Sequence, residues 1–336
     1  MASRPTPLKA GTVTSGTDET GPRARSLFAD YLSIARPDHW IKNIFVIPGA
    51  ALAIGLSTHF TWTEILLKVM LALTCACLIA SANYTINEWL DAASDRHHPV
   101  KCRRPAASGR LKASVVYVQW LLLSALGLSV AWYLGRWFTI AATTLLIMGV
   151  IYNVAPLRTK DRQYLDVLSE SVNNPLRFVL GWTAVAADVL PPSSILIAYW
   201  MGGAYLMAVK RYSEYRFIGN PERAGLYRRS FRHYTETSLL LSAVYYALAS
   251  AFFLGVFLIK YKIELLLSIP FLALLFVWYL QLGMGHDSVA QNPERLYKER
   301  AFMCYVAGIA VLFTVLLGVK LPWLQFLVES HVSAGR

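Results

Sequence analysis

The chain has 336 residues, of which 56% are hydrophobic and only 15% are charged, and its mean hydropathy is +0.43. Soluble domains carry about 25% charged residues, so this composition excludes an ordinary water-soluble enzyme and indicates a membrane protein. The net charge of +12 could suggest a nucleic-acid partner. We expect none, because the basic residues alternate with long apolar segments instead of forming one basic domain.

The chain begins with a segment rich in Ser, Thr, Gly, Pro and Arg that contains no apolar stretch. We expect residues 1–30 to be a disordered cytoplasmic tail and not a cleaved signal peptide. Apolar segments follow, each about long enough to cross a bilayer. The nine segments are 42–59, 64–86, 113–134, 137–153, 165–187, 194–210, 237–259, 263–283 and 301–324. We therefore predict an all-α membrane protein with nine transmembrane helices in one domain, residues 31–325, and a short tail, residues 326–336.

The distribution of Lys and Arg predicts how the chain sits in the membrane. Most of the 32 basic residues precede the first apolar segment or lie in the connections after the second, fourth, sixth and eighth. The opposite side holds Arg136, Lys260, Lys262, Lys320 and Arg336. Because basic connections stay in the cytoplasm, we predict a multi-pass protein of the cytoplasmic membrane. Its N-terminus is then cytoplasmic and its C-terminus is on the other side.

The end of the second apolar segment carries the most informative motif. Asn87, Asp91 and Asp95 are spaced by four residues, which on a helix places their oxygens on one face, about 6 Å apart per step. Hard oxygen ligands suit Mg²⁺, which binds through one or two carboxylates together with substrate phosphates. We predict a Mg²⁺ site formed by these three residues, with Asp91 and Asp95 as catalytic groups. The alternative is a solvated helix end with scattered charges.

Basic residues near this motif suit the phosphates of an anionic substrate. The predicted ligands are Lys42 before the first segment, Lys101 and Arg104 after the second, and Arg158 and Lys160 after the fourth. We also place Tyr152 in the substrate site and assign Lys101 a catalytic role. Two alternatives remain open: Arg158 and Lys160 could be ordinary topology determinants, and Lys42 could extend to the headgroups.

The fifth apolar segment carries polar residues that a membrane span normally lacks: Asp166, Glu170, Asn174 and Arg177. Their spacings of four, four and three place them on one helix face. Ionisable groups within spans are costly and usually face a cavity. We predict that this face lines the same polar cavity as the Asp motif, with Arg177 as a catalytic phosphate ligand. The alternative is an internal pair between Arg177 and Glu170 or Asn174.

The pattern Asn87-xxx-Asp91-xxx-Asp95, followed by basic residues and Pro105, resembles the UbiA superfamily of intramembrane prenyltransferases. The resemblance implies nine helices around a central cavity open to the cytoplasm, with a diphosphate held by Mg²⁺ on Asp-rich motifs. Glu88 is a mild departure from the pattern.

Further segments resemble one branch, the decaprenyl-phosphate phosphoribosyltransferases. They begin at Arg36, His98, Leu176, Lys210 and Asn292, and the resemblance covers roughly residues 30–325. Aromatic prenyltransferases of the superfamily carry a second Asp-rich motif at the end of the sixth segment. This chain has Lys210, Arg211 and Glu214 there, and a basic pair suits a phosphate monoester without a second metal. The segments 153–160 and 173–175 depart from the branch.

The resemblance implies transfer of 5-phosphoribose from phosphoribosyl diphosphate to a polyprenyl phosphate, with Lys210 and Arg211 holding the acceptor phosphate. It also implies a lipid-linked pentose that becomes a D-arabinose donor for exported glycans, including nodulation factors. Two other functions remain open. One is an aromatic prenyltransferase that uses a polyprenyl diphosphate. The other is a transporter or flippase, although no inverted repeat is visible. Small residues in 198–204 predict close packing within the chain or within a homo-oligomer.

Overall fold

The computed structural model describes residues 26–56, 61–96, 101–285, 288–291 and 293–327. The described chain is helical, with short 3₁₀ turns between the α-helices. The helices are α1 (Leu27–Ile34), α2 (Val46–Leu56), α3 (Trp62–Asp95), α4 (Ala113–Leu134), α5 (Arg136–Asn153), α6 (Leu165–Ser171), α7 (Asn173–Val185), α8 (Ser193–Ile218), α9 (Pro221–Tyr227), α10 (Glu236–Tyr261), α11 (Ile269–Met284) and α12 (Arg300–Gly318). Most of the two predicted tails lies outside the described residues, and α1 begins at Leu27, inside the range 1–30.

Six described stretches are long and apolar enough to cross a membrane: Leu27–Leu56, Trp62–Ala93, Ala113–Leu134, Glu236–Tyr261, Ile263–Met284 and Arg300–Gly318. The protein is therefore an integral membrane protein. The predicted segments 137–153, 165–187 and 194–210 are helical as well, in α5, α6 with α7, and α8. They do not belong to those six stretches, so the count of nine spans stays a prediction.

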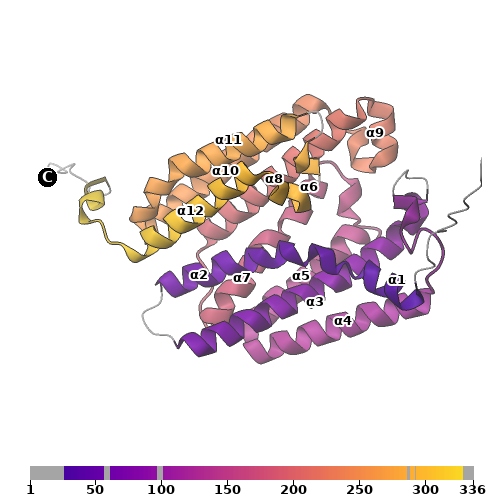
Figure 1. Ribbon diagram of the computed structural model, residues 1–336, viewed down its shortest axis with the longest axis horizontal. Helices are drawn as coiled ribbons and strands as arrows, with labels where there is room; N and C mark the ends of the chain where they lie inside the picture. Colours follow the sequence, from indigo (N-terminus) through magenta and orange to yellow (C-terminus); the bar gives the residue numbers. More distant parts are fainter. Residues whose placement is uncertain (1–25, 57–60, 97–100, 286–287, 292, 328–336) are drawn as a thin grey trace, which may run out of the picture.

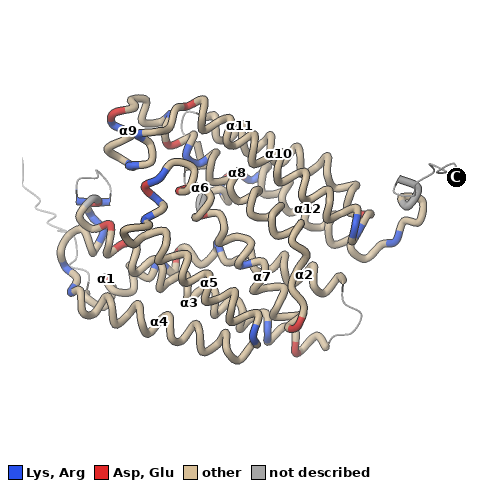
Figure 2. The backbone as a smooth tube through the Cα atoms, turned by 180° about the vertical axis from the view of Figure 1, so that it is seen from behind, with Lys and Arg blue, Asp and Glu red and all other residues tan. Residues whose placement is uncertain are grey.

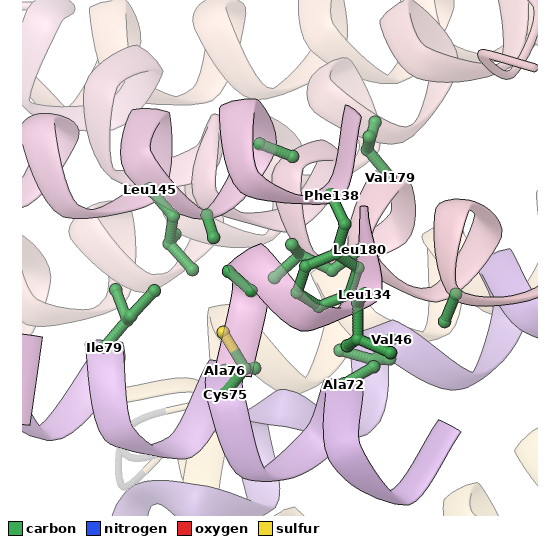
Figure 3. Close-up of a cluster of buried hydrophobic side chains, with 14 residues drawn as sticks. Val46, Ala72, Cys75, Ala76, Ile79, Leu134, Phe138, Leu145, Val179 and Leu180 are labelled. Atoms are coloured by element: carbon green, nitrogen blue, oxygen red, sulfur yellow. The ribbon is translucent and has the colours of Figure 1, made fainter. Parts of the chain in front are cut away.

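The helices form two groups that lie side by side (Figure 1). One group contains α2, α3, α4, α5 and α7, and the other contains α8, α10, α11 and α12. Buried side chains such as Ile79, Phe138 and Leu180 fill the first group (Figure 3). Small residues allow the closest crossings: a Cβ on Gly49 would lie 2.0 Å from the Phe178 carbonyl oxygen. Backbone approach of this kind is how helices associate in a membrane without a hydrophobic driving force.

The predicted continuous helix over 165–187 is interrupted at Val172, between α6 and α7. Pro175 has no backbone N–H and so cannot donate to the Ser171 carbonyl, which ends the regular ladder. As a result, α6 packs against α8, whereas α7 packs mainly against α2 and α5. The small residues of 198–204 pack within the molecule, since a Cβ on Gly203 would lie 2.3 Å from the Asn174 side-chain nitrogen.

Charged residues gather at the end of the bundle that carries α9 and the start of α4 (Figure 2). The C-terminal end of α3 and the connections after α3, α5 and α8 meet there. The fold thus brings together most of the polar residues that the sequence pointed to.

Candidate active site

The Asp motif lies on the last turns of α3, where Asn87, Asp91 and Asp95 belong to one uninterrupted α-helix, as predicted. The side-chain oxygens of Asn87 and Asp91 share one partner, the Lys160 ammonium, at 3.1 and 2.5 Å. Asp95 instead accepts a hydrogen bond from the Arg104 guanidinium at 2.7 Å. We call the set Asn87, Asp91, Asp95, Arg104, Arg158 and Lys160 the α3 cluster.

Lys160 lies on the 3₁₀ turn Thr159–Asp161 (η3) and is almost completely buried, with 7% of its surface exposed. Its third proton goes to the side-chain oxygen of Asn153, at 2.9 Å. Burial lowers the pKa of Lys160, and the Asp91 carboxylate opposes this shift. An ammonium enclosed by three oxygen acceptors marks a position that accepts a cation.

Arg158 adds a second cation to Asp91. Its Nη2 lies 3.0 Å from Asp91 Oδ1, and its Nε lies 2.9 Å from Asp161 Oδ2. The backbone of Arg158 is left-handed, with φ at 31°, which is an uncommon conformation outside glycine. The connection after α5 is thus shaped so that both of its basic residues reach α3.

Lys101 begins the 3₁₀ turn Lys101–Arg103 (η2) in the connection after α3 and lies over the ring of Tyr227, with Nζ 5.1 Å from the ring centroid. Burial and the neighbouring Arg104 lower its pKa to about 8. A lysine with a pKa this close to neutrality is typical of a binding or catalytic position.

A second polar group lies near the C-terminal end of α8, the end that we predicted to face the cytoplasm. We call Arg211 and its partners Asp166, Glu170 and Glu214 the Arg211 cluster. The Arg211 guanidinium donates to Glu170 Oε2 at 2.7 Å and to Glu214 Oε2 at 3.1 Å, and its Nε lies 3.6 Å from Asp166. The Tyr152 hydroxyl also donates to Glu170, at 3.0 Å. Burial would raise the pKa of Glu214, but Arg211 and Lys210 outweigh burial and hold that pKa below its usual range.

Asp166 ties α6 to the connection between α8 and α10. It is fully buried and accepts hydrogen bonds from the Ser230 and Tyr234 hydroxyls, at 2.9 and 2.8 Å. Arg228, from the same connection, lies 3.6 Å from Asp166. Arg228 and the adjacent Tyr227 therefore belong to the site. The signal for them in the sequence was the group of arginines within residues 228–232.

Arg177 does not form an ion pair with Glu170. That pair was one of the two internal pairs that we gave as alternatives for the fifth segment. Its Nε donates to Asn43 Oδ1 at 2.8 Å, and Asn43 in turn donates to the Cys77 sulfur at 3.2 Å. Within the described part of the chain, no carboxylate forms an ion pair with Arg177, which is 8% exposed. A buried cation that contacts no carboxylate directly suits an anionic ligand.

A model of the UbiA prenyltransferase family matches residues 43–306. The chain belongs to the UbiA prenyltransferase family. A decaprenyl-phosphate phosphoribosyltransferase of Mycolicibacterium smegmatis is 29% identical over 227 residues, which cover 66% of this chain and 69% of that protein. The nodulation protein NoeC of Azorhizobium caulinodans is 31% identical over 290 residues, which cover 85% of this chain and 81% of the relative.

The fold of this UbiA-family member also matches a solved structure. A UbiA homolog from Archaeoglobus fulgidus, bound to GPP and Mg²⁺, superposes with a TM-score of 0.64 over 86% of this chain and all of that one, at 21% identity. At that identity the match supports the common fold, and the roles of individual residues depend on the geometry in this chain.

The α3 cluster contains oxygen ligands of the kind that bind a hard divalent cation. Asn87 and Asp91 already share one cation, the Lys160 ammonium, through oxygens, and the Asp95 carboxylate follows one helical turn later. Carboxylate and amide oxygens are the ligands that Mg²⁺ takes in proteins. Among the described residues, no three His, Cys, Asp or Glu side chains form a metal-binding group by themselves.

The predicted central cavity is not confirmed. A groove of about 560 Å³ lies between α6, α8 and α10 of this UbiA-family chain. Its lining residues are Tyr164, Leu168, Trp200, Met201, Ser238, Leu241, Ser242, Tyr245 and Tyr246. None of the residues predicted for the site lines this groove, so a cavity open to the cytoplasm stays a prediction.

Proposed function

We propose that the protein transfers 5-phosphoribose from phosphoribosyl diphosphate to a polyprenyl phosphate as a Mg²⁺-dependent membrane enzyme. The observation that carries this proposal is the charge at the end of α8. The end of α8 carries the basic pair Lys210 and Arg211 where a second Asp-rich motif would hold a second metal, and Arg211 pairs with Glu170 and Glu214. In the described part of the chain, Lys210 forms no salt bridge, although Glu214 and Glu170 act on its charge, and its ammonium suits a phosphate monoester.

The donor diphosphate would bind at the α3 cluster. Asn87, Asp91 and Asp95 would hold Mg²⁺, which neutralises charge on the leaving diphosphate. The basic groups around this face would hold the phosphate oxygens and fix the direction of the ribose C1 atom. They are Lys101, Arg104, Arg158, Lys160 and Arg228.

The acceptor phosphate would bind at Lys210 together with Lys42, and its polyprenyl chain would extend into the bilayer. Arg211 was predicted as a direct ligand of this phosphate, but its guanidinium faces three carboxylates and is 2% exposed. We therefore assign Arg211 and Tyr152 a positioning role through Glu170. Arg177 would hold a phosphate oxygen deeper in the bundle.

The chemical step needs no strong base, because a phosphate monoester is already ionised at neutral pH. An oxygen of the acceptor phosphate forms a bond to ribose C1 as the C1 bond to the diphosphate oxygen breaks. Pyrophosphate leaves with that electron pair. In-line displacement inverts the configuration at C1.

The product would be a lipid-linked pentose phosphate made at the cytoplasmic face. After loss of its 5-phosphate and epimerisation, such a lipid would serve as a D-arabinose donor for exported glycans. Similarity to a relative named as a nodulation protein motivates nodulation factors as one class of target.

The proposal is tested with the full-length protein purified in detergent, Mg²⁺, polyprenyl phosphate and radiolabelled phosphoribosyl diphosphate. We expect label in an acid-labile lipid, and we expect it to be lost with EDTA. If no lipid is labelled while a prenyl diphosphate reacts with an aromatic acceptor, the chain is an aromatic prenyltransferase. Uptake into sealed vesicles without any covalent product would instead identify a transporter.

A further inference from the structure

The Lys160 ammonium occupies the oxygens that would bind the metal. It is within hydrogen-bond distance of Asn87 Oδ1, Asp91 Oδ1 and Asn153 Oδ1, and it lies 6.0 Å from the Tyr152 ring centroid. A protonated lysine has three N–H donors, and here each has an oxygen acceptor. The ammonium is therefore fully satisfied by a cage that includes two of the three proposed metal ligands.

Charges in this region are matched. Asp91 is paired with Lys160 and Arg158, Asp161 with Arg158, and Asp95 with Arg104. A divalent cation that approaches Asn87 and Asp91 would meet the Lys160 ammonium at the same oxygens. The two cations would repel each other, so Lys160 on Asn87 Oδ1 and Asp91 Oδ1 weakens the binding of a metal ion to these residues.

We infer that Lys160 is the internal counter-ion of the metal site, and that it competes with the divalent cation for Asn87 and Asp91 until an anionic phosphate draws it away. This inference rests on the proposed function only for the identity of the metal ligands.

The consequence is coupled binding of metal and phosphate. A displaced Lys160 would be a buried cation without a counter-charge, which is costly. A phosphate group bound next to the metal supplies that counter-charge, and the flexible lysine stem lets the ammonium turn towards it. By linkage, each ligand then tightens the binding of the other by the same factor. The divalent cation alone binds weakly.

The test measures Mn²⁺ binding to the full-length protein in detergent by electron paramagnetic resonance, with inorganic phosphate as the anion. In the wild-type protein, we expect phosphate to tighten Mn²⁺ binding. In Lys160→Met without phosphate, we expect binding to be about 5- to 150-fold tighter than in the wild type, the usual range of coupling between sites. Phosphate should then tighten Mn²⁺ binding less than it does in the wild type, because Lys160 is gone and only Arg158 still competes at Asp91 Oδ1.

The matched control is Arg162→Met, which removes an exposed cation two residues along the same connection and should bind Mn²⁺ like the wild type. Asn153→Ala removes one acceptor of the ammonium without touching a proposed metal ligand. It should tighten Mn²⁺ binding less than Lys160→Met does, and it keeps the test open if Lys160→Met does not fold.

Unchanged Mn²⁺ affinity in Lys160→Met and Asn153→Ala would overturn the inference. The proposed metal site is judged separately by Asp91→Asn. If Mn²⁺ binds and this variant abolishes binding, the metal site stands whatever the lysine does. If Mn²⁺ binding is insensitive to Asp91→Asn, the proposed metal site itself is wrong, and the inference is wrong with it.

Discussion

The α3 cluster and the Arg211 cluster are built from the same residue types at the same end of the bundle, but they differ in exposure. The difference lies in the arginines. In the α3 cluster, the Arg104 and Arg158 side chains are 25% and 26% exposed. In the other, the central Arg211 side chain is 2% exposed, although its partner Glu170 is 32% exposed. An arginine that solvent can reach can exchange its partner for a ligand, whereas a buried arginine cannot do so without losing its counter-charge. We therefore expect the first cluster to act on substrates and the second to hold helices together.

The largest effect should come from Asp91→Asn, which removes the carboxylate that holds the cation in the α3 cluster. Turnover in the radiolabelling assay should fall by at least about 100-fold, the usual cost of losing a group that stabilises the leaving charge. The melting temperature should also fall, because the buried Lys160 loses the Asp91 carboxylate, whereas Arg158 keeps Asp161 as a partner. Asp188→Asn, on the exposed connection between α7 and α8, is the matched control. Turnover at the wild-type rate in Asp91→Asn would contradict the metal assignment.

Breaking the Arg211 cluster should affect stability first. Arg211→Met removes the shared counter-ion of Asp166, Glu170 and Glu214, of which Asp166 is fully buried, and this should cost about 3 kcal/mol of unfolding free energy. Thermal unfolding in detergent measures this loss. Arg104→Met, which also breaks an ion pair but at a side chain 25% exposed, should cost less. Equal melting temperatures for these two variants would remove the distinction between the clusters.

Arg228 lies between the two clusters, so a variant at this position tests whether the substrate site extends beyond the α3 cluster. Arg228→Gln should raise the KM for phosphoribosyl diphosphate about tenfold, the loss of one charge-assisted hydrogen bond. The adjacent Arg229 is the control, because its side chain is 71% exposed and its ion pair among the described residues is a long one, to Asp161 at 3.6 Å. Arg229→Gln should leave KM nearly unchanged. If both variants behave alike, Arg228 is not a substrate ligand.

The smallest effect is a pH dependence from Lys101, whose pKa is lowered to about 8. Asp95 and Glu214 favour its charged form, whereas burial, Arg104 and Arg228 oppose it. As pH rises through about 8, the ammonium loses its proton, so KM for phosphoribosyl diphosphate should rise a few-fold. Without ligand, the free energy of unfolding should increase as the pH rises from about 8 to 10.5. Over that range the Lys101 side chain binds more protons in the unfolded chain than in the folded one. Lys101→Arg should flatten the KM profile, and an unchanged profile would argue against Lys101 as a ligand.

Much of the fold could be predicted because a bilayer imposes a simple length rule on apolar segments. Where the structure describes them, the predicted segments are mostly helical, and the Asp motif lies at the end of one continuous helix. The break between α6 and α7 was missed, although Pro175 signalled it. The apolar stretch Leu27–Leu56 overlaps the first predicted segment and also contains α1.

The sequence predicted which residues belong to the candidate site better than it predicted which of them pair with one another. The sequence pointed to Asp91, Lys160 and Arg158, and the structure joins all three. It could not show that Arg211 faces inward to three carboxylates while the adjacent Lys210 does not pair with them. Successive residues on a helix point about 100° apart, so neighbours in sequence can differ completely in surroundings.

By itself, the sequence determined that this is a helical membrane protein with an oxygen-rich helix face beside basic connections, because hydropathy and helical spacing are local properties of the chain. Only the tertiary structure decided which charges meet. It put Lys160 between Asn87 and Asp91 and enclosed Arg211 among carboxylates from two helices. The physical reason is that the strength of an ion pair depends on distance and burial, and both are set by packing between segments far apart in the chain.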